Sequence, residues 1–359
     1  MPEVARQRMT TASRISLDCI IFGLQRFGGI SNYWARLVDH ASADMAINGT
    51  LVVPRQVTFN EFDAAWTHRM TVVHEGLDAR VARYLRAPVS VAQDVFHTSY
   101  YRLPTRRVGK YVVSAYDFTY ERYRSGLARL VHSVQKFRSL ERADAVLCIS
   151  DSTRRDILEM CPRVDARKLH VVHLGVDRAT YFPESKAMQP ALENTVLFVG
   201  QRAGYKRFDL AIAAISLSKR LSLGIVGPTL RADERETLHR ALGERWHAFG
   251  SVSNAQLRQL YSSANAFVFP SDYEGFGLPV LEAMACGCPV VAANTASLPE
   301  VGGSAARYAE NQTGEAYASA LQALESTDSR ESSIRAGIAR ADQFSWSQTM
   351  RETFAIYHQ

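Results

Sequence analysis

The chain alternates short, wholly apolar runs with longer stretches in which apolar positions recur at helical spacing. Residues 196–199 and 266–269 contain no polar side chain, which is typical of parallel strands buried on both faces. Strands that alternate with helices in this way predict right-handed βαβ units and open, doubly wound α/β sheets. The predicted strands span 15–22, 50–53, 94–97, 110–116, 145–149, 169–173, 195–199, 223–226, 266–270 and 289–292, with helices at 30–41, 208–219 and 254–263 among the intervening segments.

The alternation breaks between residues 176 and 194. This stretch contains Pro183 and Pro190 without any regular period, and an apolar run restarts at Thr195. We therefore predict two α/β domains. Their predicted ranges are 1–178 with the C-terminal helix 344–359, a linker at 179–194, and 195–343.

Composition narrows the class of protein. The 359 residues are 47% hydrophobic and 22% charged, which excludes a mainly disordered or collagen-like chain. No apolar run reaches the ~18–20 residues that span a bilayer. Residues 1–14 lack the apolar core of a secretory signal and suggest a flexible basic tail. Five cysteines without framework spacing indicate a reducing compartment, so we expect a cytoplasmic protein.

The charge is unevenly distributed. Residues 1–178 hold 26 Lys and Arg against 18 Asp and Glu, whereas the rest of the chain holds 16 against 18. The excess of positive charge in residues 1–178 is consistent with binding to an anionic membrane face or to a phosphorylated ligand. It is equally consistent with a surface that only contacts solvent. Without an arginine- and lysine-rich helix or an aromatic RNA-binding signature, we expect no nucleic-acid partner. The sequence offers no cluster of metal-ligand residues, so no metal site is expected.

The segment from Phe269 to Ala285 is the most informative. A buried strand is followed by a loop with Glu274, Gly275 and Gly277, and then by a helix that Pro279 can begin. The unpaired N–H groups of such a helix start form an anion site. With Glu282 one turn into the helix, the segment offers two carboxylates for sugar and ribose hydroxyls beside a phosphate site.

Two other loops offer groups for a diphosphate. Arg202 and Lys206 lie four residues apart around Gly204, just after a predicted strand. Arginine binds phosphate oxygens bidentately and lysine acts as a point charge. Gly28 and Gly29 open a predicted helix and let the backbone approach a ligand, although the segment is neither a Rossmann fingerprint nor a P-loop.

A fourth segment is aromatic and polar. Asp117 follows a buried strand and is surrounded in sequence by Tyr116, Phe118, Tyr120 and Tyr123. Such a surface suits carbohydrate rings, which present C–H faces and hydroxyl groups. An interdomain or lipid-facing surface is an equally good interpretation of these residues alone.

Taken together, these segments resemble the retaining glycosyltransferases of family 4, also called glycosyl transferases group 1, which have the GT-B fold. The string from Glu274 to Glu282 is similar to the family's E-x7-E signature. The family's diphosphate loop is similar to residues 200–206, and its N-terminal glycine loop is similar to residues 27–30. The segment that enters the family's linker is similar to residues 171–177. Residues 344–357 resemble the helix that crosses back to the first domain.

The resemblance implies two Rossmann-like domains that face a central cleft, with donor on the second domain and acceptor on the first. It assigns the donor diphosphate to Arg202 and Lys206, with Gly28 and Gly29 approaching from the other side. It assigns Glu274, as a catalytic residue, to the donor sugar, and Glu282 to the ribose. The remaining donor contacts it implies are the backbone N–H groups of Phe276, Gly277 and Leu278, and Val252 at the base.

The implied reaction is retaining, metal-independent hexosyl transfer, with a nucleotide sugar as co-substrate and no cofactor. Many relatives have His-Asp where this chain has Tyr116-Asp117, so only Asp117 is carried over, as an acceptor-side catalytic residue. The loop 200–208 is most similar to bacterial polysaccharide mannosyltransferases, which favours GDP-mannose as the donor and a glycan or lipid-linked saccharide as the acceptor. Two alternatives to this function stay open, namely a UDP- or dTDP-sugar as the donor, or a non-catalytic sugar-binding module. Peripheral contact with the inner face of an anionic membrane is also left open.

Overall fold

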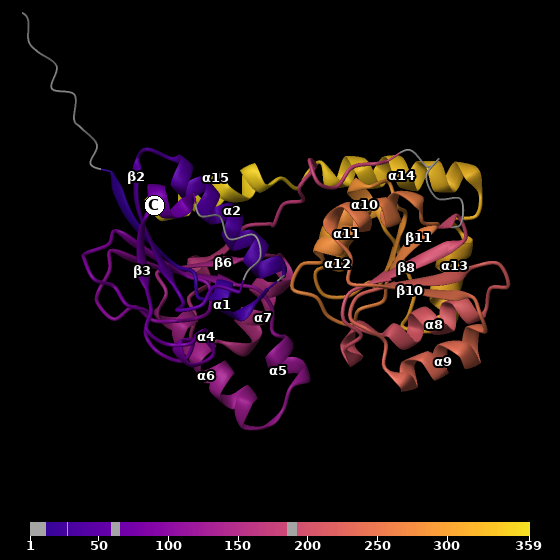
Figure 1. The fold of residues 1–359 in the computed structure, drawn as a ribbon, viewed down its shortest axis with the longest axis horizontal. Helices are drawn as coiled ribbons and strands as arrows, with labels where there is room; N and C mark the ends of the chain where they lie inside the picture. Colours follow the sequence, from indigo (N-terminus) through magenta and orange to yellow (C-terminus); the bar gives the residue numbers. More distant parts are fainter. Residues whose placement is uncertain (1–11, 27, 59–64, 185–191) are drawn as a thin grey trace, which may run out of the picture.

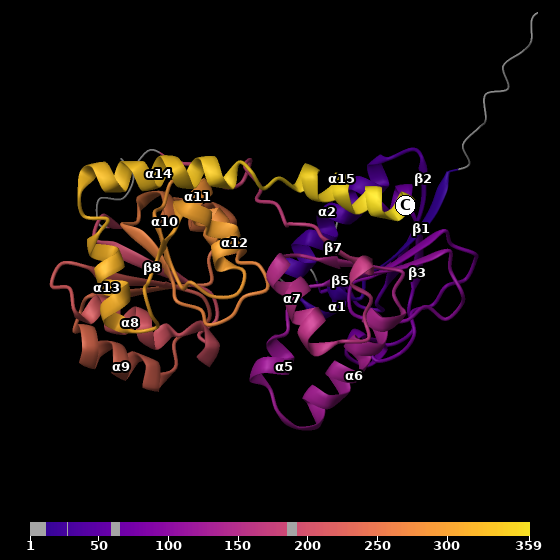
Figure 2. The same ribbon diagram turned by 180° about the vertical axis from the view of Figure 1, so that it is seen from behind.

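The computed structural model describes residues 12–26, 28–58, 65–184 and 192–359. The chain forms two lobes joined by two connections (Figures 1 and 2). Most of the predicted N-terminal tail, Phe27 of the glycine loop and residues 185–191 of the predicted linker lie outside the described residues.

The first lobe is built on a seven-stranded, all-parallel sheet in the order β3-β2-β1-β4-β5-β6-β7. Its strands are β1 (Ser13–Asp18), β2 (Ile47–Val53), β3 (Thr71–His74), β4 (Val95–Thr98), β5 (Lys110–Ala115), β6 (Ala145–Cys148) and β7 (Leu169–Val171). Its helices are α1 (Ile21–Leu24), α2 (Gly29–Ala43), α3 (Trp66–Arg69), α4 (Ala79–Ala82), α5 (Thr119–Tyr123), α6 (Gly126–Arg142) and α7 (Asp151–Met160).

The second lobe contains a six-stranded parallel sheet in the order β10-β9-β8-β11-β12-β13. Its strands are β8 (Thr195–Val199), β9 (Ser222–Val226), β10 (Trp246–Gly250), β11 (Ala266–Phe269), β12 (Val290–Ala292) and β13 (Arg307–Tyr308). Its helices are α8 (Phe208–Ser216), α9 (Ala232–Leu242), α10 (Asn254–Ser263), α11 (Leu278–Ala285), α12 (Leu298–Gly302), α13 (Gly314–Gln322) and α14 (Thr327–Ala341).

The predicted fold class, two doubly wound α/β sheets, is confirmed. The predicted strand 15–22 was wrong at its end, because β1 stops at Asp18 and residues 21–24 form the short helix α1. The strands β3, β10 and β13 were not among those predicted. All three lie at sheet edges and are partly exposed, so they lack the continuous apolar run that marks an inner strand.

The last helix, α15 (Trp346–His358), leaves the second lobe and crosses to the first. Figures 1 and 2 place α14 along the outer side of α11 and α15 beside α2. The Tyr357 hydroxyl lies 2.6 Å from His97 Nδ1, and the Lys110 ammonium donates to the Ile356 carbonyl over 2.8 Å. Burial lowers the pKa of His97 to about 3, so this histidine is a neutral core residue.

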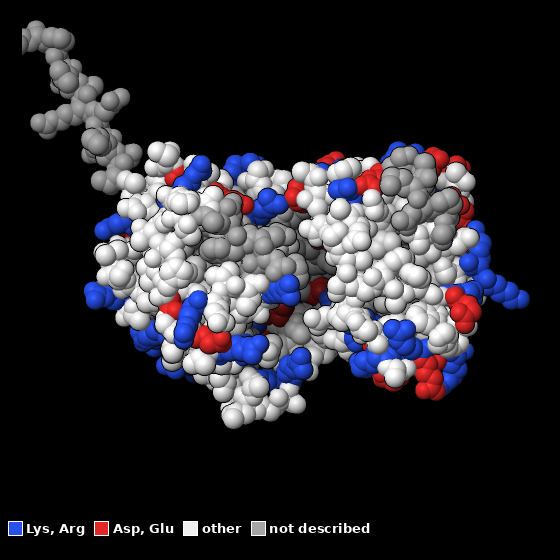
Figure 3. All heavy atoms as spheres, in the orientation of Figure 1, with Lys and Arg blue, Asp and Glu red and all other residues white. Residues whose placement is uncertain are grey.

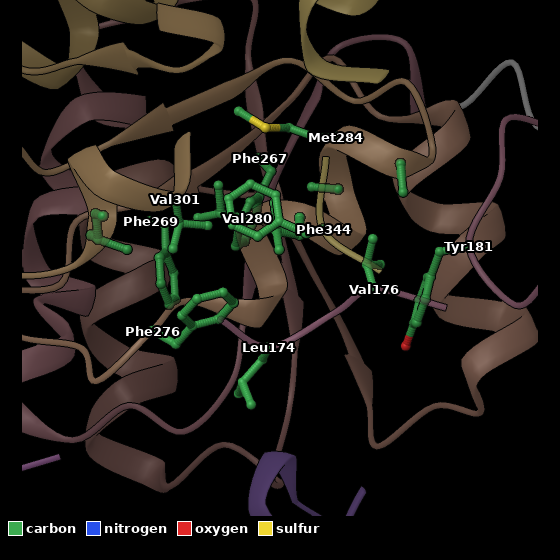
Figure 4. Close-up of a cluster of buried hydrophobic side chains, with 14 of the residues drawn as sticks. Leu174, Val176, Tyr181, Phe267, Phe269, Phe276, Val280, Met284, Val301 and Phe344 are labelled. Carbon is green, nitrogen blue, oxygen red and sulfur yellow. The ribbon is translucent and has the colours of Figure 1, made fainter. Parts of the chain in front are cut away.

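The core of the second lobe extends to its connection with the first. Figure 4 shows Phe267, Phe269 and Val280 packed together, with Phe276 from the loop before α11 and Leu174 from the first connection close to them. This packing of buried rings and aliphatic side chains anchors the loop between β11 and α11 to the core through Phe276.

The described helices do not include one with the length and apolar character needed to cross a membrane. The longest, α6, has 17 residues and carries several charges. All five cysteines are buried free thiols. Cys286 and Cys288 belong to the hydrophobic core of the second lobe.

Candidate active site

The strand order of each sheet reverses once, between β1 and β4 in the first lobe and between β8 and β11 in the second. Ligands of open α/β sheets bind beyond the carboxyl ends of the strands at such a switch point. The loops after β1, β8 and β11 carry Gly28, Gly29, Arg202, Lys206 and Glu274. The topology therefore places these predicted residues at the switch points of the two sheets.

The start of α11 has a backbone geometry that suits an anion. The buried Ser297 hydroxyl contacts the carbonyls of Glu274 (2.8 Å) and Phe276 (2.7 Å), and Gly277 adopts φ 107°, which few other residues tolerate. No described group accepts a hydrogen bond from the N–H groups of Phe276, Gly277 or Leu278. These three donors and the positive end of the α11 dipole favour an anion at this point.

Lys206 and Glu274 meet at this helix start. The Lys206 ammonium lies 2.5 Å from Glu274 Oε1, and both side chains are largely buried. The ammonium also lies 5.2 Å from the centre of the Phe269 ring, where cation–π attraction favours it. One cation and one carboxylate, 68 residues apart in sequence, thus lie side by side.

Arg202 lies in a different ion pair. Its guanidinium binds the Glu234 carboxylate at 2.9 Å and 3.2 Å and the carbonyls of Pro228 and Thr229. Its Nη1 atom is buried and has no partner among the described groups. The structure thus fixes Arg202 after β8 with its Nη1 amino group unused, and does not pair it with the carboxylate that Lys206 binds.

The two lobes touch at glycines. A Cβ built on Gly275 would lie 2.1 Å from the Tyr116 carbonyl oxygen, and one on Gly29 would lie 3.2 Å from the Leu278 side chain. Gly28 lies beneath the Gln25 side chain. The glycine loop of the first lobe therefore lies against the start of α11, and the loop carrying Glu274 lies against Tyr116-Asp117.

Asp117 lies at the wall of a cavity of about 750 Å³. Its Oδ1 accepts the N–H of Thr119 over 2.9 Å at the start of α5. Six tyrosines are among its lining residues. Tyr123 from the first lobe stacks on Tyr205 from the second, with ring centres 5.0 Å apart. Burial, with Glu274 and Asp117 nearby, raises the pKa of Tyr205 to about 12, so its hydroxyl stays protonated and can donate.

Tyr116 does not take the place of an exposed histidine. Its side chain is buried, and its hydroxyl accepts a hydrogen bond from the Trp34 indole N–H over 2.6 Å. Burial raises its pKa well above the usual value. Tyr116 therefore acts as a core residue beneath the Asp117 turn.

Sequence patterns missed the group that holds Asp117 in place. Lys136, on α6, is fully buried and donates to the Asp117 carbonyl (2.5 Å) and to Glu121 Oε2 (2.9 Å). Burial would raise the pKa of Glu121, but His132, whose Nδ1 lies 3.4 Å from Oε1, and the charge and hydrogen bond of Lys136 lower it to about 2. A lone lysine on an amphipathic helix gives no sequence signal for this role.

Glu282 lies in a second cavity, of about 300 Å³, which is also lined by Asn254, Tyr181 and Arg36. Burial raises the pKa of Glu282 to about 7, although a hydrogen bond with Tyr181 lowers it by a smaller amount. Val252 packs against the core of the second lobe just before α10, two residues from Asn254. The predicted ribose and base contacts thus lie at one side of the α11 start, and Asp117 at the other.

The raised pKa of Glu282 gives a prediction about stability. A carboxyl whose pKa is about 7 when folded and 4.5 when unfolded binds a proton more tightly in the folded state. Its contribution to the free energy of unfolding therefore falls by about 2–3 kcal/mol as pH rises from 4.5 to 7. We expect the Glu282→Gln variant to lose this slope in urea unfolding, whereas the exposed Glu236→Gln variant keeps it; equal slopes in wild type and Glu282→Gln would contradict the assignment.

Polar contacts between the lobes were also missed. The Tyr273 hydroxyl donates to Asp156 Oδ2 (2.5 Å) and contacts the Phe118 N–H (2.7 Å). Glu300 accepts the N–H of Asp151 at the start of α7 over 2.7 Å. These contacts join residues that are more than one hundred positions apart, so only the folded chain reveals them.

Three described residues other than glycine have positive φ, namely Tyr101, Arg207 and Ala296. Each lies in a loop after a strand carboxyl end, following β4, β8 and β12 in turn. Such strain is retained where function requires a fixed loop.

The described residues include no group of three or more His, Cys, Asp or Glu side chains placed to hold a metal ion.

Comparison with known proteins accounts for this arrangement. Residues 27–180 match the family model Glycosyltransferase Family 4, and residues 184–340 match the model Glycosyl transferases group 1. The chain belongs to this glycosyltransferase family. The resemblance seen in the E-x7-E string is therefore confirmed, and the two lobes are those of a GT-B glycosyltransferase.

Among curated relatives, O-antigen chain mannosyltransferase B of Escherichia coli is 33% identical over 234 residues, which cover 61% of each chain. The match thus spans about three fifths of that relative's length. Among solved structures, sucrose-phosphate synthase from Thermosynechococcus elongatus superposes with a TM-score of 0.77 at 18% identity, over 97% of this chain and 98% of the other. Anabaena HepE, solved with UDP and glucose, gives 0.69 at 16% identity over 96% and 99%. At these identities the structural matches establish the fold.

Proposed function

We propose that this glycosyltransferase moves mannose from GDP-mannose onto a glycan or lipid-linked saccharide acceptor, with retention of the anomeric configuration and without a metal ion or cofactor. The observation that carries the proposal is the Lys206–Glu274 pair at the start of α11, 2.5 Å apart beside three unused backbone donors. The identity of 33% to a mannosyltransferase supports mannose as the transferred sugar.

In the proposed reaction, an acceptor hydroxyl oxygen forms the new bond to the anomeric carbon, on the face from which the diphosphate departs. The bond between that carbon and the diphosphate oxygen breaks, and the hydroxyl proton passes to the departing diphosphate. Lys206, Arg202 Nη1 and the N–H groups of Phe276 to Leu278 stabilise the negative charge that develops there. Such electrostatic stabilisation usually contributes most of the rate enhancement in an active site of this kind.

The other residues divide between donor and acceptor. Glu274 accepts hydroxyls of the donor sugar once the diphosphate takes up Lys206, and Glu282 accepts ribose hydroxyls near Val252. Gly28 and Gly29 let the first lobe reach the phosphates. Asp117, in the tyrosine-lined cavity, orients the acceptor hydroxyl. We further propose a cytoplasmic location with peripheral contact at the inner face of the membrane.

A donor screen on the purified protein in chelator tests this proposal. We expect a thermal shift and nucleoside diphosphate release with GDP-mannose, and a smaller response to UDP-glucose, UDP-GlcNAc and dTDP-rhamnose. A stronger response to one of the other sugars would replace the donor while keeping the chemistry. Binding without release, even with added oligosaccharide acceptors, would favour a non-catalytic module, and loss of release in chelator would contradict metal independence.

A further inference from the structure

Exposed apolar side chains gather on one part of the first lobe. Fourteen large apolar side chains are exposed among the described residues, and eight of them belong to two short stretches, 77–85 and 127–134. Single exposed apolar residues are ordinary, whereas a contiguous group marks an interaction site. These eight are Leu77, Val81, Tyr84, Leu85, Leu127, Leu130, Val131 and Val134, which we call the α4–α6 surface.

The two stretches form one continuous surface. The Gln135 side chain donates to the Arg83 carbonyl over 2.5 Å, which ties α6 to the end of α4. Tyr84, Leu85, Leu130, Val131 and Val134 line a shared cavity of about 510 Å³. A second cavity, of about 490 Å³, opens beside Leu130 and extends to Phe137 and Met160. Apolar grooves thus lie on both sides of the exposed face of α6.

Arginines surround this apolar surface. Arg80, Arg86, Arg129, Arg138 and Arg142 are all exposed in or beside the two stretches, where the acidic residues are Asp78 and Glu141. Figure 3 shows basic atoms along the lower margin of the first lobe, where Figure 1 places α4 and α6, with a few acidic atoms among them and uncharged atoms below them. An aliphatic helix face with arginines at its borders has the composition of a helix that lies on an anionic bilayer.

We propose that the α4–α6 surface docks the enzyme on an anionic lipid bilayer and that the acceptor is presented from that bilayer. The inference rests on the proposed function, and α6 connects the two. Its inner face supplies His132 and Lys136 to the cavity that holds Asp117, while its outer face carries Leu127, 75% exposed, and Leu130, 59% exposed. A saccharide anchored in the bilayer beside α6 lies one helix diameter from the acceptor cavity.

Vesicle co-sedimentation of the full chain tests the docking step. We expect binding to vesicles of 70% phosphatidylcholine and 30% phosphatidylglycerol to be at least tenfold tighter than binding to pure phosphatidylcholine, and to weaken as salt is raised. Leu127→Gln with Leu130→Gln should weaken binding at least tenfold, because two exposed leucines lose their burial in lipid. Arg129→Gln with Arg138→Gln should weaken it about 25-fold, at about fivefold per arginine.

Two further measurements separate docking from chemistry. The Leu217→Gln variant removes a leucine that is 56% exposed on the second lobe and should bind vesicles as wild type does. Donor turnover on a soluble acceptor should be unchanged in all these variants, so failed docking and failed catalysis give different results. The proposal is overturned if wild type ignores anionic vesicles, if both α6 variants bind normally, or if sedimentation velocity shows that the leucine pair instead holds two copies together.

Discussion

Replacing Lys206 with methionine is expected to lower turnover by about two to three orders of magnitude, the usual effect of removing one group that stabilises developing charge. The ammonium lies 2.5 Å from Glu274 Oε1 at the start of α11, so it lies beside the proposed diphosphate position. Methionine keeps the length and apolar contacts of the side chain and removes the charge. Initial rates at saturating donor would measure the effect.

Matched variants show whether the loss belongs to this charge. Lys206→Arg should recover part of the activity, because it restores a cation whose planar fork fits the site less well than a compact ammonium. Lys219→Met changes an exposed lysine of the same lobe and should leave the rate unchanged. Turnover of Lys206→Met within about fivefold of wild type, in a protein with an unchanged melting temperature, would remove Lys206 from the proposed mechanism.

The central part of the site was predictable from the sequence because its geometry is local. The run from Ala266 to Ala285 contains a buried strand, a glycine loop and a helix with Pro279 in its first turn, and the structure has these elements as β11, the loop and α11. Backbone donors at a helix start follow from that order alone. Sequence therefore predicted the strand, the loop and the helix start without reference to the rest of the chain, whereas the assignment of Phe276, Gly277 and Leu278 to the donor came from the family resemblance.

The side-chain partners were not predictable, because they depend on how distant segments approach one another. Nothing near Arg202 in sequence indicates that Glu234 will take its guanidinium, nor that Lys136 will reach the Asp117 carbonyl. Tyr116 resembles a site residue by position, yet it faces Trp34 in the core. Periodicity predicts which face of a helix is buried, whereas ion pairs between distant segments require the three-dimensional arrangement.

Replacing Arg102 with methionine is expected to lower the free energy of unfolding of the first lobe by about 3–5 kcal/mol, the usual cost of removing one partner from a buried ion pair. The side chains of Arg102 and Asp18 are fully buried and 2.9 Å apart, and Glu75 lies 2.5 Å away on the other side. Without the arginine, two carboxylates remain in the core. Differential scanning fluorimetry should give a drop in melting temperature of about 10 °C.

The dependence of this loss on pH distinguishes a buried charge from lost packing. Burial raises the pKa of Asp18, although Arg102 lowers it by a smaller amount, so removing Arg102 raises that pKa further. A carboxyl whose pKa is raised in the folded state lowers the free energy of unfolding as pH rises. The stability that Arg102→Met loses relative to wild type should therefore become smaller at acid pH, where this carboxyl is protonated. Arg14→Met breaks the exposed pair with Asp94 and should shift the melting temperature little at any pH. A deficit for Arg102→Met that stays constant down to pH 4 would assign the effect to packing, since an unpaired carboxylate could not then be its cause.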